Sequence, residues 1–153
     1  MEAFLLAAHV LGGILFVGPV AVANSLFPRY VPLAVEGVAR ERDEARSSRV
    51  ALALHRITRV YGTLGLVVPI IGIALSFVQG RFGEVWITVA MIVTALAGGL
   101  LAFRIVPAQA DAIVHPPQRG RLVRLGTLAG VFNLMWAAVV ILMVVRPGSD
   151  YVS

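Results

Sequence analysis

The sequence predicts an all-α integral membrane protein, a four-helix bundle in which every helix crosses the bilayer. Of the 153 residues, 59% are hydrophobic and only 14% are charged, and the mean hydropathy of +0.89 is too high for an ordinary soluble domain. About 20 apolar residues in helical form cross the roughly 30 Å hydrocarbon core. The apolar runs are long and unbroken, whereas the strands of a membrane barrel alternate in polarity. We therefore expect helices, in one membrane domain over residues 1–153.

Four spans are expected at about 3–27, 60–79, 85–106 and 122–145. Residues 36–59, ahead of the second span, keep helical periodicity, with an apolar stripe on one face and arginines on another. We expect this segment to form a cytoplasmic, amphipathic lead-in on the membrane surface. Its arginines, which are expected to meet anionic lipid headgroups, are Arg42, Arg46, Arg49 and Arg56.

The arginines predict the orientation of the chain. All thirteen basic residues are arginines, and all but Arg81 and Arg146 lie in or beside the connections between spans 1 and 2 and between spans 3 and 4. By the positive-inside rule both connections are cytoplasmic, so the N- and C-termini are outside. No nucleic-acid motif accompanies the basic residues, so the expected partner is the anionic lipid surface and not nucleic acid.

Two prolines interrupt predicted spans. Pro19 and Pro69 each remove an N–H from a helix interior and free a carbonyl one turn earlier, at Leu15 and Gly65. We expect both helices to kink at these points.

Small residues mark the faces on which the helices are expected to pack, because helices in lipid associate through close backbone approach and polar contacts. Gly126 and Gly130 have GxxxG spacing in the fourth span, and Asn133 continues their face. Further packing glycines are Gly98 in the third span and Gly65 and Gly72 in the second. The favoured interpretation is packing within one bundle, and a homodimer seam is the alternative. Asn133 is the best candidate for a specific bond between helices.

His9 is the ionisable side chain that lies deepest in a predicted span, near Gly12 and Gly13. A histidine in a membrane span is by default a functional hypothesis. The favoured interpretation is structural, with the ring hydrogen-bonded to a neighbouring carbonyl. The alternative is an axial ligand of haem b, which the nearby glycines would let approach the helix. His55 and His115 are expected at the cytoplasmic side, too far from His9 for a second ligand.

Other chemistry is sparse. The chain has no cysteine, which excludes disulfides, thiolate metal sites and cysteine nucleophiles. No carboxylate lies within a predicted span, so a proton relay lacks its main residue type. We predict no catalytic residue and no metal site.

The first span also carries a resemblance. His9 to Gly13, Phe16 to Pro19 and Phe27 to Arg29 resemble the opening of a family of small four-span bacterial membrane proteins of unknown function. The spacing of His9, Gly12 and Gly18 is similar to that of the copper-resistance D-type membrane domain. A histidine-bearing first helix that ends in Pro-Arg is similar to the HemJ-type protoporphyrinogen oxidases. The resemblance implies a bacterial cytoplasmic membrane, and the HemJ likeness implies His9 as a haem ligand.

The favoured functional interpretation is a non-enzymatic accessory, scaffold or assembly subunit without a cofactor, with a homodimer or larger membrane complex as its assembled form. The alternative is a haem b-binding membrane redox protein. A third reading, a component of a small-molecule or metal permease, would require a continuous polar path across the bilayer.

Overall fold

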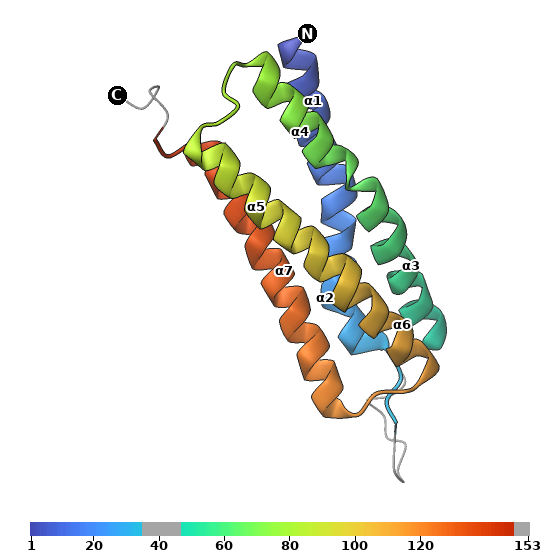
Figure 1. The fold of residues 1–153 in the computed structure, drawn as a ribbon. Helices are drawn as coiled ribbons and strands as arrows, with labels where there is room; N and C mark the ends of the chain where they lie inside the picture. The colour runs from blue at the N-terminus through green and yellow to red at the C-terminus, as the bar shows by residue number, and fades with distance from the viewer. Residues whose placement is uncertain (35–46, 149–153) are drawn as a thin grey trace.

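The computed structural model describes residues 1–34 and 47–148. Within these residues, four long helices pack into a bundle (Figure 1), which confirms the all-α four-helix prediction. Each helix is long and apolar enough to cross a membrane: Glu2–Tyr30, Ser48–Val78, Val85–Val114 and Arg119–Val145. Helices of 27 to 31 residues extend about 40–46 Å. They therefore continue beyond a hydrocarbon core of about 30 Å.

The first helix is interrupted by a π-helical turn. It consists of α1 (Glu2–Gly12), the π turn η1 (Gly13–Val17) and α2 (Gly18–Tyr30). Pro19, at the start of α2, has no N–H to donate one turn back. In the π turn η1, just before Pro19, the backbone hydrogen bonds span five residues instead of four. This wider turn accommodates the hydrogen bond that Pro19 cannot make. The irregularity expected at Pro19 is therefore a π turn ahead of the proline.

The third helix repeats the arrangement. It consists of α5 (Val85–Leu100), the π turn η2 (Leu101–Ile105) and α6 (Val106–Val114). Pro107 follows η2 as Pro19 follows η1, and it too lacks the N–H that would continue the regular ladder.

The second helix is broken at Gly65–Leu66, between α3 (Ser48–Leu64) and α4 (Val67–Val78). The break lies one turn before Pro69, where the sequence predicts a freed carbonyl. The Gly65 carbonyl instead accepts a hydrogen bond of 3.1 Å from the Val68 N–H, so it does not remain unsatisfied.

The fourth helix, α7 (Arg119–Val145), contains no proline and is continuous. It follows an extended connection at His115 and Gln118, as the Pro116-Pro117 pair predicts. The turn between α4 and α5 uses Gly80 and Gly83 at positive φ, of 66° and 106°.

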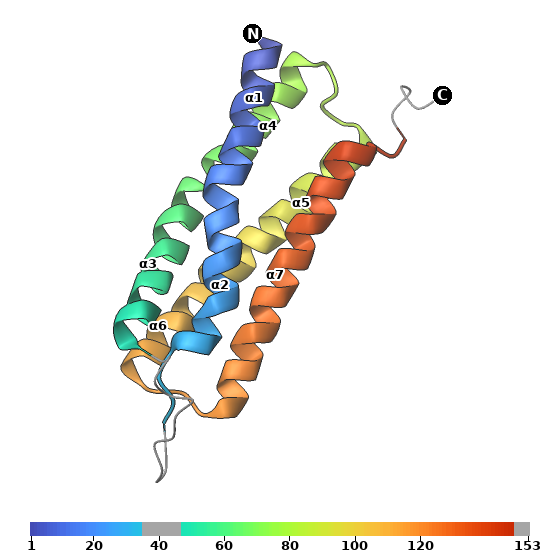
Figure 2. The ribbon, with the colours of Figure 1, turned by 180° about the vertical axis from the view of Figure 1, so that it is seen from behind.

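The helices pack in pairs at one end and as a group at the other. At the end that holds the start of α1 and the end of α7, here called the terminal end, α1 packs against α4 and α5 against α7. Figures 1 and 2 show that these two pairs diverge toward the terminal end. At the opposite end, α2 packs against both α3 and α7, and α3 packs against α6. We call this the arginine-rich end, since it holds Arg29, Arg49, Arg56, Arg59, Arg119, Arg121 and Arg124.

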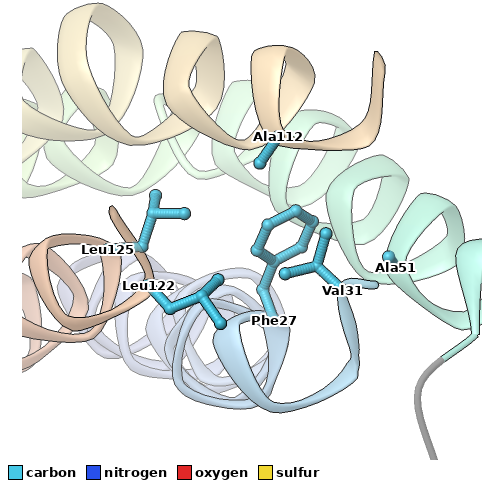
Figure 3. Close-up of a cluster of buried hydrophobic side chains, with 6 residues drawn as sticks. All are labelled: Phe27, Val31, Ala51, Ala112, Leu122 and Leu125. Carbon is cyan, nitrogen blue, oxygen red and sulfur yellow. The ribbon is translucent and has the colours of Figure 1, made fainter. Parts of the chain in front are cut away.

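Two hydrophobic clusters form the core. The cluster at the arginine-rich end consists of Phe27, Val31, Ala51, Ala112, Leu122 and Leu125. Figure 3 shows the Phe27 ring at its centre, between Val31 and Leu122 and facing Ala112. The second cluster, nearer the middle of the bundle, consists of Val20, Ala97, Leu101, Ile105 and Phe132.

The helix α3 differs from the surface lead-in expected over residues 36–59. Its residues Ser48 onward run directly toward α4, and they pack against α2 and α6 as part of the bundle. Ala51 is completely buried in the core. The second helix therefore begins about twelve residues before the predicted span, because the arginines of α3 lower its hydropathy without preventing one face from being buried. Residues 36–46 lie outside the described part of the chain.

Candidate functional site

His9 joins the first two long helices. Its Nδ1 lies 2.9 Å from the backbone carbonyl oxygen of Val68. Because a carbonyl can only accept, Nδ1 carries the proton and donates. The ring lies against α4 at Gly72, where an added Cβ would lie 2.7 Å from His9 Cε1. Gly72 is thus the small residue that admits the imidazole between α1 and α4.

The other predicted packing glycines have different surroundings. Gly65 forms the break between α3 and α4. At Gly98, Gly126 and Gly130, an added Cβ would meet open space in the described part of the bundle. The favoured interpretation, that Gly126 and Gly130 pack inside one bundle, therefore does not describe their position. The side of α7 that is buried in the bundle instead presents Leu122, Leu125, Ala129, Phe132 and Val139.

Asn133 lies between the buried and the open sides of α7. Its Nδ2 donates a 2.9 Å hydrogen bond to Ser25 Oγ on α2, and Ser25 Oγ in turn donates to the Ala21 carbonyl at 2.8 Å. The Oδ1 atom of Asn133 is buried, and so is Nε1 of Trp136 one turn along; neither has a hydrogen-bond partner within residues 1–34 and 47–148. The asparagine thus ties α7 to α2.

A buried polar cluster joins three helices near the arginine-rich end. Its members are Asn24 on α2, His55 and Thr58 on α3, and Gln109 on α6. Asn24, Thr58 and Gln109 are each at most 1% exposed. Asn24 Oδ1 accepts hydrogen bonds from Thr58 Oγ1 at 3.1 Å and from Gln109 Nε2 at 3.0 Å. The other end of the Gln109 amide, Oε1, accepts from His55 Nδ1 at 3.2 Å.

This polar cluster lies between the two hydrophobic clusters. Phe27 and Ala112, each three residues beyond a cluster member, belong to the core on one side, and Val20 and Ile105 belong to the core on the other. In such an apolar setting a hydrogen bond is stronger than in water, and a buried polar atom without a partner lowers the stability of the fold. Asn24 Nδ2 is buried and has no hydrogen-bond partner in the described part of the chain.

The sequence predictions did not include Gln109 and Thr58 in this cluster. Gln109 falls just after the predicted end of the third span, in a short polar segment that reads as a connection. The signal that could have found it was Asn24, an intramembrane amide that requires partners on other helices.

Arginine side chains surround a cavity between α6 and α7. The cavity has a volume of about 420 Å³ and is lined by Arg104, Arg121 and Arg124 together with Asp111 and apolar residues. Arg121 forms an ion pair of 2.9 Å with Asp111, and His115 Nδ1 lies 3.0 Å from the other carboxylate oxygen. Among the arginines assigned to lipid headgroups, Arg49 and Arg56 are exposed on α3. Arg42 and Arg46 lie outside the described residues.

The described ranges contain no cluster of three or more histidine, cysteine or acidic side chains that could hold a metal ion. Comparison of the chain with protein-family models, with curated proteins and with solved structures finds no match.

Proposed function

We propose that this chain is a non-enzymatic subunit of a membrane assembly, and that it assembles as a homodimer through the open face of α7. The observation that supports this most directly is the position of Gly126 and Gly130. Both glycines are exposed, and an added Cβ would meet open space at either position. In lipid, small residues on an outer face allow the backbone of another helix to approach closely.

The open face extends over several turns of α7. At 100° per residue, Gly126, Gly130 and Ala137 lie within about 40° of one another around the helix axis. Ala137 is also exposed. Asn133 borders this face, but its Oδ1 is buried inside the bundle.

Each histidine has a hydrogen-bond partner within the described residues. His9 bonds to the Val68 carbonyl, His55 to Gln109 and His115 to Asp111. The first two of these bonds join different long helices.

We also propose that the protein resides in the bacterial cytoplasmic membrane with both termini outside. Support comes from the distribution of charge along the bundle. The arginine-rich end carries seven arginines of the described helices, whereas the terminal end carries Arg81 and Arg146. An excess of basic residues on one side is typical of the cytoplasmic side.

Assembly is tested by placing leucine at the two glycines. We expect the double variant Gly126→Leu/Gly130→Leu to lose the dimer, because two branched side chains would hold the helix backbones apart. Energy transfer between differently labelled chains in vesicles measures association. The matched control is Gly18→Leu on the first helix, a glycine that is likewise exposed and open. A wild-type chain that is monomeric in vesicles, or equal loss in the control, would overturn the proposal.

Haem binding is a second candidate, and one observation favours it. Metal-ligating histidines almost always donate their second ring N–H to a carbonyl, carboxylate or water. His9 makes such a bond through Nδ1, which leaves the Nε2 lone pair for a ligand. The described residues fit a single axial ligand, because His55 and His115 lie toward the opposite end of the bundle.

The two candidates are distinguished by colour. If His9 binds haem, protein purified from haem-replete cells shows a Soret band, and His9→Ala removes it while His115→Ala does not. A colourless wild-type preparation from such cells would refute haem binding.

A further inference from the structure

The cavity between α6 and α7 combines several cations with apolar walls. Arg104 comes from η2, Asp111 from α6, and Arg121 and Arg124 from the first two turns of α7. Its apolar lining consists of Ala108, Ala112, Pro117, Leu125 and Leu128. The volume of about 420 Å³ is within the range of small-molecule sites.

The positive charge of this cavity is only partly neutralised. Asp111 pairs with Arg121 at 2.9 Å and with His115 at 3.0 Å. Arg104 and Arg124 have neither an ion pair nor a side-chain hydrogen bond in the described part of the chain. The carboxylate that lines the cavity, Asp111, pairs with Arg121 and not with Arg104 or Arg124. Guanidinium groups bind phosphate oxygens through paired, charge-assisted hydrogen bonds.

The surroundings of the cavity indicate an amphipathic ligand. Next to Arg104 and Arg124, Phe103 is 79% exposed and Val123 is 69% exposed. Exposed apolar side chains beside arginines are typical of the depth at which acyl chains meet headgroups. Farther along the same helices, toward the terminal end, the exposed residues Leu96 and Val131 continue the apolar surface.

We propose that this cavity is a binding site for an anionic phospholipid of the leaflet at the arginine-rich end. Arg104 and Arg124 hold the phosphate group, and the acyl chains lie against Leu128 and the apolar surface beyond it. Asp111 keeps Arg121 in place at the outer rim. The proposal is independent of the dimer, because Gly126 and Gly130 are on a different side of α7 from Leu128.

The site is tested by titrating lipid into the full-length chain in detergent and counting bound lipids by native mass spectrometry. The probes are phosphatidylglycerol, which carries a net charge, and phosphatidylcholine, which does not. We expect phosphatidylglycerol to bind about tenfold more tightly or better, since its net negative charge is attracted to both arginines.

Paired variants separate a specific site from general attraction to positive charge. Arg104→Gln/Arg124→Gln should lower the affinity for phosphatidylglycerol to that for phosphatidylcholine. The control Arg29→Gln/Arg59→Gln removes the same charge from exposed positions on α2 and α3 that do not line the cavity, and it should leave the affinity within about twofold. Equal loss in both double variants would overturn the proposal, because the attraction would then be diffuse.

A third variant tests the cavity without changing its charge. Thr127 lines the cavity and is exposed, so Thr127→Trp should fill the space and block the lipid while all arginines remain. Circular dichroism checks that each variant keeps its helices. Unchanged lipid binding in a folded Thr127→Trp chain would place the lipid elsewhere.

Inorganic phosphate distinguishes the lipid from a soluble anion. We expect millimolar phosphate to compete only weakly, because it cannot use the apolar walls. If phosphate binds as tightly as phosphatidylglycerol and displaces it, the ligand is a soluble phosphate and the lipid proposal is wrong.

Discussion

The amide of Gln109 is almost completely buried, yet both of its ends are engaged by other helices. Nε2 donates to Asn24 on α2, and Oε1 accepts from His55 on α3. Apolar packing alone tolerates some sliding or rotation of one helix against another. A hydrogen bond between side chains requires a defined distance and angle, so the polar cluster fixes how α2, α3 and α6 are positioned along one another.

Replacing Gln109 tests this role. Gln109→Leu preserves the approximate volume but leaves His55 Nδ1 without its acceptor and Asn24 with one donor fewer. We expect the free energy of unfolding to fall by about 1–3 kcal/mol, measured by denaturation in mixed micelles. The control is Gln118→Leu at an exposed position, and an equal loss of stability there would contradict the argument.

Gly72 provides a second test at the residue scale. An alanine Cβ at this position would lie 2.7 Å from His9 Cε1, so the ring must shift from the position in which it bonds to Val68. We expect Gly72→Ala to destabilise the fold by about 1–3 kcal/mol. Gly98→Ala, which meets open space, should be neutral or stabilising because alanine is the better helix former.

The clash at Gly72 can be isolated with a double-mutant cycle. In the His9→Ala background there is no ring to displace, so Gly72→Ala should cost little. We expect a coupling free energy of about 1 kcal/mol or more between the two positions. Additive effects would show that the glycine has another purpose.

At the scale of elements, hydropathy predicted the number and order of the long helices because the apolar runs are continuous. It did not predict where α3 begins. The arginines of α3 lower its mean hydropathy below that of a span, and periodicity identified an amphipathic helix without showing which surface covers its apolar face. Only the tertiary structure shows that this surface is α2 and α6.

The sequence did not predict the two π turns either. Proline at position 19 predicted an irregularity, but whether the chain responds with a kink, a break or a wider turn depends on neighbouring helices. Pro19 and Pro107 each follow a π turn, whereas Pro69 follows a break.

Among the predicted site residues, spacing placed Gly126 and Gly130 on one face but could not show whether that face is inside the bundle.

The packing of α3 is tested by enlarging one alanine. Ala51 is completely buried whereas Ala53, two residues along, is exposed. If α3 belongs to the bundle core, Ala51→Leu overpacks it and lowers the free energy of unfolding by about 1–3 kcal/mol. Ala53→Leu should change that free energy by less than about 0.5 kcal/mol. Equal tolerance of both substitutions would indicate a helix that lies apart on the membrane surface.

At the scale of the whole molecule, the proposed orientation can be measured directly because the natural sequence contains no cysteine. We expect Phe82→Cys, in the turn between α4 and α5, to react with a membrane-impermeant maleimide added to intact cells. Gln118→Cys, in the connection before α7, should react only after the membrane is opened. The reverse pattern would invert the topology, and with it the assignment of the arginine-rich end to the cytoplasm.

The irregular points η1, Gly65–Leu66 and η2 have a mechanical consequence. They interrupt three of the four long helices partway along their lengths, between the closely packed arginine-rich end and the diverging pairs. A helix bends most easily where its regular ladder of backbone hydrogen bonds is already broken. We therefore expect bending to be easier in the pair α1–α4, where both long helices are interrupted, than in the pair α5–α7, where α7 is continuous.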